Sequence, residues 1–136
     1  MKWWPLECKS GDMIRVKIGS IYHFGIFVSN GEVIQFGLPP RPEYQNDPRR
    51  TQVCATDMDL FSGGAIVEAA RFSLAEKLKK FSAKKIVERA RARLGETGYD
   101  ILHNNCEHFV YECVFGQKRS PQIEEIQKRW ESVCQK

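Results

Sequence analysis

The first part of the chain alternates apolar and polar residues, a pattern that predicts β-strands. Residues 13–18 alternate apolar and polar side chains, as a half-buried strand does. Residues 21–28 are rich in β-branched and aromatic side chains and predict a central strand. The Asn30-Gly31 pair after them favours a tight hairpin whose turn residues have positive φ angles. Residues 32–36 would then return antiparallel to the central strand.

The pattern changes character after residue 50. Residues 51–54 predict a short strand, and residues 56–61 predict a capped helical turn that ends at Ser62-Gly63-Gly64. Residues 65–72 predict another strand, although their alanines leave a helix open. Residues 99–102 predict a short extended piece before the next helix.

Helical spacing of apolar residues predicts three helices in the second half. Ser82 caps the clearest, residues 83–94, whose inward stripe is Ile86, Val87, Ala90 and Leu94. A second helix begins at Cys106 and ends before Gly116, with an inward face of Phe109, Val110, Cys113 and Val114. Residues 121–134 predict a third, with Ile123, Ile126, Trp130 and Val133 or Cys134 inward. Strands followed by helices indicate an α+β fold.

Composition narrows the class of protein. The chain has 136 residues, 42% of them hydrophobic, which suits one domain, residues 1–136, with a real core. A net charge of +4 is too small to suggest a nucleic-acid partner. No apolar run is long enough for a transmembrane helix, and the first residues do not resemble a signal peptide. The spacing of the five cysteines fits neither a zinc site nor a disulfide scaffold, so we expect a reduced, cytoplasmic protein without a metal or cofactor.

Two surface segments have open interpretations. Residues 37–57 are rich in proline and lack a period, so they form either a surface excursion or a loop that lines a cleft with Leu38, Pro39 and Pro40. Lysines and arginines crowd residues 77–93. Such a basic face is either merely solvated or makes peripheral contact with an anionic membrane.

Cys106 is the candidate nucleophile. Asn104 and Asn105 precede it, and asparagine is a good N-cap, so Cys106 should lie in the first turn of its helix. Free backbone N–H groups and the positive end of the helix dipole there favour a thiolate. The alternative is a buried cysteine that packs as a small apolar residue.

A cysteine enzyme also needs a base and a group that orients the base. His23 on the central strand and Gln35 on the returning strand are candidates for these roles. In a regular hairpin Gln35 would lie opposite a residue near Ile26, so a His23–Gln35 hydrogen bond needs sheet twist or a bulge. Taken alone, each residue is as readily a structural one. His108 points away from Cys106 on the helix, whereas His103 is a rival base that spacing does not exclude.

Several segments together resemble one family. Residues 105–109 read Asn-Cys-Glu-His-Phe, residues 22–28 resemble its histidine strand, and residues 31–35 resemble its returning strand. Gly-Asp at 11–12 and the segment from Arg89 to Tyr99 also match. The chain thereby resembles the lecithin:retinol acyltransferase (LRAT)-like proteins over about residues 8–120. Residues 121–136 would be a C-terminal helix or tail.

The resemblance implies a circularly permuted papain-like fold related to NlpC-type peptidases. It implies Cys106 as nucleophile, His23 as base and Gln35 as the third polar residue. The vertebrate enzymes generally carry a second histidine at the position of Gln35, and they end in a hydrophobic anchor that these residues do not show. The Cys106 N–H is the expected oxyanion donor, with Tyr22 as a second donor and Asn105 in support.

Three functions are open at this point. The first is acyl transfer or phospholipase A-type hydrolysis of acyl lipids through a thioester. The second is a cysteine amidase or peptidase that uses the same three residues. The third is a module that binds a lipid or a partner without catalysis. The expected substrate of the first two is an acyl ester or acyl amide, and the sequence leaves the oligomeric state open.

Overall fold

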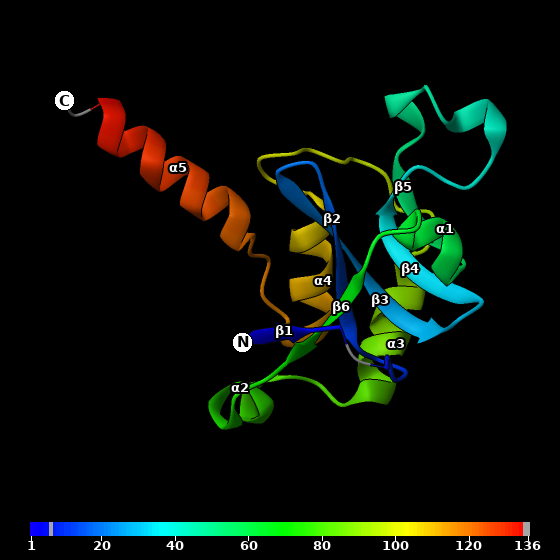
Figure 1. Cartoon of the computed structure of the whole chain (residues 1–136), viewed down its shortest axis with the longest axis horizontal. Coiled ribbons are helices and arrows are strands. Elements are labelled where there is room, and N and C mark those ends of the chain that lie inside the picture. The colour runs from blue at the N-terminus through cyan, green and yellow to red at the C-terminus, as the bar shows by residue number, and fades with distance from the viewer. Residues whose placement is uncertain (6, 135–136) are drawn as a thin grey trace.

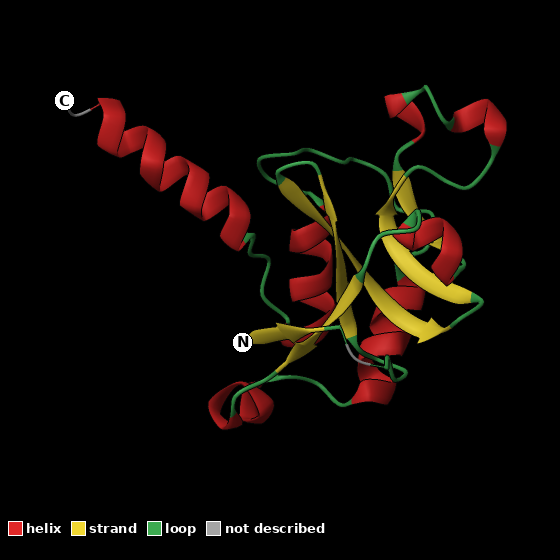
Figure 2. Cartoon of the chain, viewed as in Figure 1, coloured by secondary structure: helices red, strands yellow, loops and turns green. Residues whose placement is uncertain are grey.

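Six strands form one antiparallel sheet in the computed structural model, which describes residues 1–5 and 7–134 (Figure 1; Figure 2). The strand order is β1-β6-β2-β3-β4-β5. The strands are β1 (Lys2–Trp4), β2 (Met13–Ile18), β3 (Ile21–Ser29), β4 (Glu32–Gly37), β5 (Gln52–Thr56) and β6 (Val67–Arg71). The predicted strands are therefore confirmed, and residues 67–71 are strand and not helix. The start of the chain adds an edge strand that the pattern did not predict.

The described residues form five helices; two of them cover one face of the sheet, and the last projects away from it (Figure 1). The helices are α1 (Met58–Ser62), α2 (Leu74–Lys79), α3 (Ala83–Ala92), α4 (Cys106–Phe115) and α5 (Pro121–Cys134). Two 3-10 turns, Pro42–Tyr44 and Pro48–Arg50, interrupt the proline-rich loop. The prediction of an α+β fold, with an antiparallel sheet against helices and Cys106 at a helix start, is confirmed.

The sheet buries apolar side chains on both faces. On one face α3 and α4 bury a large cluster that includes Phe24, Ile26, Phe36 and Phe109. The opposite face carries a smaller cluster around Phe61 of α1. Because successive residues of a strand point to opposite faces, Phe24 and Ile26 face α4 while Phe27 faces α1.

The β3–β4 hairpin differs from the predicted turn. Neither Asn30 nor Gly31 has a positive φ angle. The pairing shifts between Phe27 and Ser29, so that the ladder contains a bulge. A bulge adds local twist, which lets a turn without positive φ angles join two twisted strands. One consequence is that Gln35 pairs with Gly25 and not with Ile26.

Three expectations for the helical half are wrong. Leu94 is 45% exposed, because α3 ends at Ala92 before its last predicted turn. Residues 99–102 form a turn around an isolated Asp100–Asn104 bridge and not an extended piece. Ile126, Trp130 and Val133 of α5 are exposed, and Ile123 is the buried apolar residue of this helix.

Candidate active site

Asn105 fixes the start of α4 and so the position of Cys106. Its side-chain oxygen accepts hydrogen bonds from the N–H groups of Glu107 and His108, at 2.8 and 3.1 Å. Its amide nitrogen donates to the Ile101 carbonyl and to the Ser120 hydroxyl. All of the polar capacity of this buried side chain is thus used within the protein. Asn105 supports the site structurally and has no donor left for an oxyanion.

The Cys106 thiol is buried, with 7% of the residue exposed. Burial raises the pKa of this thiol to about 11, while the backbone N–H groups of Phe24, Cys106 and Glu107 oppose that rise. The resting sulfur is therefore a neutral thiol at neutral pH. The expected thiolate is not the resting form, because desolvation outweighs the helix start.

His23 and Gln35 lie together, as the family resemblance implies. The His23 Nε2 atom is 2.6 Å from Gln35 Oε1. An amide oxygen only accepts hydrogen bonds, so Nε2 carries the proton and Nδ1 keeps a free lone pair. Burial lowers the pKa of His23, and the hydrogen bond to Gln35 opposes that change. The register shift of the β3–β4 hairpin supplies the alignment that a regular hairpin lacks.

The sheet opens between β3 and β4 at the level of His23. Their ladder ends at the Gly25–Gln35 pair, although β3 continues along β2 to Ile21 and β4 continues along β5 to Gly37. The Phe24 N–H lies near the Cys106 thiol and favours its charged form. The His23 ring reaches across this opening, because a Cβ on Gly37 would lie 3.5 Å from His23 Cε1.

Gly25 lets α1 close over the other face of the histidine strand. A Cβ on Gly25 would lie 2.8 Å from the Phe61 ring and 3.0 Å from Val33. The Phe61 ring centroid is 5.4 Å from that of His23. The glycine thus allows an apolar ring to cover the imidazole, and this is part of the burial that lowers the His23 pKa.

Of the other two histidines, His108 caps the start of α4 and His103 lies on the surface. His108 Nδ1 accepts the Asn105 N–H at 2.9 Å and completes a capping box, so this ring is bound to the scaffold. His103 is exposed and lies 3.4 Å from Asp100 Oδ1. The His23 ring is held by a buried polar side chain, Gln35, and neither of these two rings is.

Tyr99 is a site residue that the sequence did not single out. Its hydroxyl lies near Cys106, and burial, with a smaller contribution from the Cys106 side chain, raises the pKa of this phenol to about 12. The ring of Tyr99 is held edge-on against Phe36, with centroids 5.1 Å apart. Tyr22, the predicted second donor, lies beside the site. The Arg15 guanidinium stacks over its ring, with Cζ 3.8 Å from the ring centroid.

A buried carboxylate ties the C-terminal segment to the nucleophile helix. Glu107 Oε1 accepts from the Ser120 hydroxyl at 2.7 Å and from the Gln122 N–H at 2.9 Å. The Gln122 side chain in turn binds both the N–H and the carbonyl of Tyr22, at 2.8 and 3.2 Å. Burial raises the Glu107 pKa, which these hydrogen bonds counter. The network holds the histidine strand, α4 and the start of α5 in one arrangement.

Cys106 opens on a small cleft with uncharged walls. The cleft has a volume of about 70 Å³, and its apolar residues come from three segments: Ile21, Tyr22, Tyr99, Ile101, Ile123 and Ile126. Two larger cavities lie under the proline-rich loop. Leu38 and Pro40 line one of about 370 Å³ that reaches Gln35, and Pro39 lines a neighbouring one of about 480 Å³.

These features define an α+β protein with a buried cysteine at a helix start and a His–Gln pair on the adjoining strands. Residues 6–119 match the lecithin retinol acyltransferase family. The chain belongs to this family.

Several characterised members are similar to this chain. Mouse lecithin retinol acyltransferase is 29% identical over 143 residues, a match that covers 90% of this chain and 62% of the mouse protein. Human phospholipase A and acyltransferase 3 is 27% identical over 128 residues, which cover 88% of this chain and 78% of the human protein. The chain thus spans less than two thirds of the mouse relative's length. Among the described residues, no helix is long and apolar enough to cross a membrane.

Proposed function

We propose that this protein is a cysteine enzyme that transfers or hydrolyses acyl groups of lipids through a thioester on Cys106. His23 is the base and Gln35 orients it. The observation that carries the proposal is the 2.6 Å contact of Gln35 with His23, on the strand whose next residue, Phe24, has its backbone N–H near the Cys106 thiol. The printed names of the relatives, acyltransferases and phospholipases A, agree with an acyl lipid as substrate.

The protonation states determine how the reaction starts. Thiol and imidazole are both neutral at rest, since burial raises the pKa of Cys106 and lowers that of His23. His23 Nδ1 takes the thiol proton as the sulfur attacks the ester carbonyl. Gln35 Oε1 then stabilises the imidazolium through its bond to Nε2. The imidazolium returns the proton to the leaving alcohol as the tetrahedral intermediate collapses to a thioester.

The second half of the reaction reverses these roles. Water, or an acceptor alcohol or amine, gives its proton to His23 Nδ1 and attacks the thioester carbonyl. The Cys106 thiolate leaves and recovers that proton, which restores the neutral pair. Water makes the protein a hydrolase and an acceptor makes it a transferase.

The oxyanion donors of this reaction are the Cys106 N–H and the Tyr99 hydroxyl. The two groups lie near each other beside the thiol. An oxyanion between them receives a hydrogen bond from each. Tyr99 takes the place that the sequence suggested for Tyr22.

The test is acylation of the protein by a short-chain p-nitrophenyl ester, read as a mass increase of the intact protein. We expect one acyl group on Cys106, none in Cys106→Ser, and acylation at least about 100-fold slower in His23→Ala. The matched control is His103→Ala, which removes an exposed histidine. Equal acylation of His23→Ala and the wild type would refute the role of His23. A panel of lipid esters and peptide amides separates the acyl-lipid reaction from a peptidase, which would turn over the amides faster.

A further inference from the structure

The Gln35 amide has a second partner behind the site, the Cys54 thiol. Gln35 Nε2 donates to Cys54 Sγ at 3.9 Å, and this thiol donates to the Gly37 carbonyl at 3.9 Å. Gln35 and Cys54 are paired in the β4–β5 ladder, so their side chains lie on the same face of the sheet. Both are buried. A hydrogen-bonded row therefore runs from His23 through Gln35 and Cys54 to Gly37.

This row has a direction because one of its ends can only accept. The Gly37 carbonyl carries no proton, so the Cys54 thiol donates to it and offers its sulfur lone pairs to Gln35 Nε2. The Gln35 amide then turns its oxygen toward His23, and His23 Nε2 carries the ring proton. Nδ1 is left unprotonated, which is the form that a base needs.

The reversed row would disable the base. An amide turned end over end has nearly the same shape, so packing alone does not choose between the two orientations of Gln35. In the reversed orientation Gln35 Nε2 would donate to His23 Nε2, and the ring proton would move to Nδ1. The Cys54 thiol would turn to Gln35 Oε1, and the Gly37 carbonyl would lose its thiol donor. The row as observed keeps that bond and with it the working tautomer of His23.

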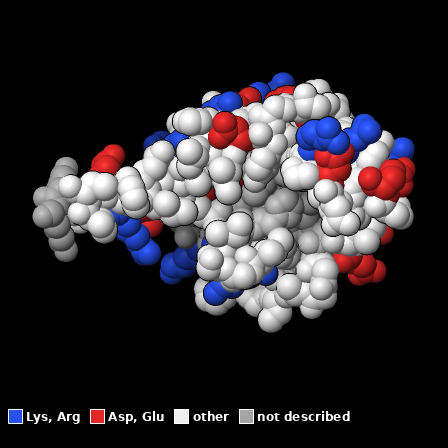
Figure 3. Space-filling model, turned by 90° about the horizontal axis from the view of Figure 1, so that it is seen from above, with Lys and Arg blue, Asp and Glu red and all other residues white. Residues whose placement is uncertain are grey.

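No charge in the described part of the chain fixes this tautomer instead. In a Ser-His-Asp triad the carboxylate does so. Here burial lowers the pKa of His23 and raises that of Cys54, hydrogen bonds oppose both changes, and no charged side chain of the described residues contributes. Seen from above, charged side chains lie toward the edges of the molecule and uncharged residues fill the middle (Figure 3). The direction of the row is left to its hydrogen bonds.

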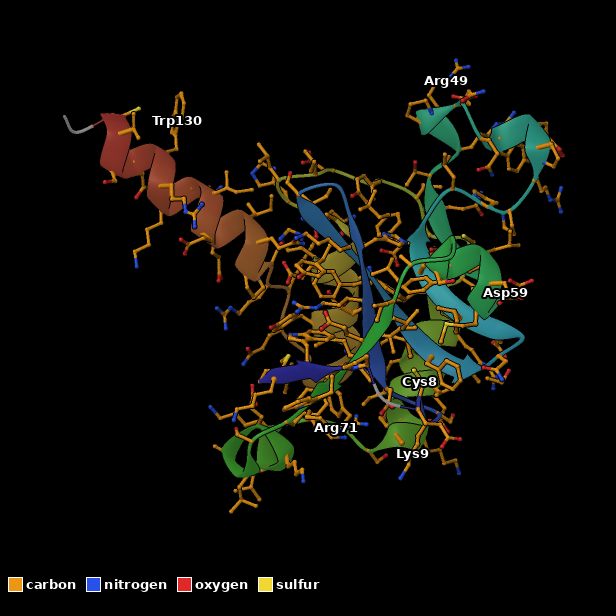
Figure 4. All side chains as sticks on the ribbon, viewed as in Figure 1. Cys8, Lys9, Arg49, Asp59, Arg71 and Trp130 are labelled. Carbon is orange, nitrogen blue, oxygen red and sulfur yellow. The ribbon has the colours of Figure 1, made fainter. Side chains whose placement is uncertain are left out.

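The two cavities under the proline-rich loop reach this row. Gln35 lines the cavity of about 370 Å³, and Cys54 lines the cavity of about 480 Å³. Figure 4 shows Arg49 on the loop itself, where it projects beyond the ends of β4 and β5. Water that enters the cavities both donates and accepts, so it favours neither orientation of the amide. Cys54 is the group that distinguishes the two orientations.

We propose that Cys54 is a positioning residue, whose thiol fixes the orientation of the Gln35 amide and, through it, the tautomer of His23. The proposal rests on the proposed function for the role of His23 as base, whereas the tautomer is a property of the folded chain. A thiol forms weak hydrogen bonds, so their loss should slow acylation of Cys106 by about 3- to 10-fold and not abolish it.

The variants separate hydrogen bonding from packing. Cys54→Val fills the space on strand β5 without a donor or an acceptor, and Cys54→Ser keeps both functions in its hydroxyl. The matched control is Cys113→Val, because Cys113 is also a buried thiol but lies in the core on α4, outside the row.

The first measurement is the ¹⁵N spectrum of the histidine ring nitrogens at about pH 8, where the rings are neutral. Protonated and unprotonated ring nitrogens have well-separated shifts, and the His23 signals are assigned by their loss in His23→Ala. We expect a proton on Nε2 in the wild type, in Cys54→Ser and in Cys113→Val. In Cys54→Val the shifts of the two nitrogens should move toward each other, because both tautomers are then populated.

The second measurement is the single-turnover rate of Cys106 acylation by the p-nitrophenyl ester. Cys54→Val should be about 3- to 10-fold slower than the wild type, whereas Cys54→Ser and Cys113→Val should stay within about twofold. A purely structural role for Cys54 would change the rate without changing the His23 tautomer.

The opposing outcomes are distinct. A wild-type His23 that carries its proton on Nδ1, or a tautomer that Cys54→Val leaves unchanged, would overturn the proposal. A Cys54→Ser variant that is as slow as Cys54→Val would also overturn it, because the thiol would then act through its shape. A tautomer that changes in Cys54→Val, in a protein whose Cys106 no ester acylates, would leave Cys54 in its role and refute the proposed function.

Discussion

Replacing Gln35 by leucine tests whether the amide orients the base. Leucine has a similar size but no acceptor, so the variant loses the 2.6 Å bond to His23 Nε2. Gln35 is 8% exposed, which leaves little room for water to replace the lost oxygen. A buried donor without a partner costs about 1–3 kcal/mol. We therefore expect His23 to lose its fixed tautomer and orientation.

The expected kinetic effect follows from this energy. The bond to Gln35 raises the His23 pKa against the effect of burial, so its loss lowers that pKa further and weakens the base. If the full 1–3 kcal/mol appears in the transition state, acylation of Cys106 slows by about 5- to 150-fold. The free energy of unfolding should fall by about 1–3 kcal/mol, because only one partner of the buried bond is removed and the His23 N–H is left without an acceptor.

The assay is the single-turnover rate of Cys106 acylation between about pH 5 and pH 9, read by intact mass. Gln52→Leu is the matched control, because Gln52 lies on the adjoining strand β5 and makes only one long, 3.5 Å bond to the Arg50 carbonyl. In Gln35→Leu the rate should fall while the acid limb moves to lower pH. An unchanged rate and an unchanged acid limb would refute the orienting role of Gln35.

The remaining predictions concern the scaffold of the site. Asn105→Ala should lower the free energy of unfolding by about 2–4 kcal/mol in urea denaturation, because it removes an N-cap and two buried hydrogen bonds; Ser82→Ala, an exposed N-cap, should cost only about 1 kcal/mol. Gln122→Ala should cost about 1–3 kcal/mol and slow acylation, because it releases both backbone groups of Tyr22 next to His23; a loss of stability with full activity would show that the clamp does not position the histidine strand. Burial lowers the pKa of His23 and His108, so the unfolded chain takes up protons first as the pH falls below their ordinary value of 6.5. Stability should therefore decrease below about pH 6.5, and urea midpoints that stay level from pH 7.5 to 5.5 would contradict this.

Local periodicity predicted most of the elements because each has a strong pattern. The apolar face of α4 is confirmed as its buried side. In residues 13–18 the pattern holds only in part, because Met13 is buried on the face opposite to Ile14 and Val16, and Ile18 is 57% exposed. The same pattern misled for α5, where Ile126 and Trp130 are exposed. Periodicity shows that a helix has an apolar side, but what covers that side depends on the rest of the chain or on a partner.

Local sequence patterns likewise predict one part of the candidate site and miss another. Cys106 lies in a local motif, and the motif and the family resemblance identified it together with His23 and Gln35. Tyr99 and the Glu107–Gln122 network come from contacts that no local pattern encodes. One part of this network has a local sequence signal: Ser120 followed by Pro121 is a typical helix start. Only the folded chain shows that Gln122 binds Tyr22, a hundred residues away.

Magnitudes explain why the expectation of a resting thiolate fails and what replaces it. A helix start stabilises a nearby negative charge by about 0.3–1 kcal/mol, and by about 2 kcal/mol at most. Burial raises the Cys106 pKa from 9.0 to about 11 even after the nearby backbone N–H groups have lowered it, a net of about 3 kcal/mol against the thiolate. Iodoacetamide, which needs a thiolate, should therefore alkylate Cys106 no faster than an ordinary buried thiol at pH 7, although an acyl ester acylates it rapidly. Fast alkylation at that pH would mean that the ion pair exists before substrate binds, and that the proton does not move with the attack.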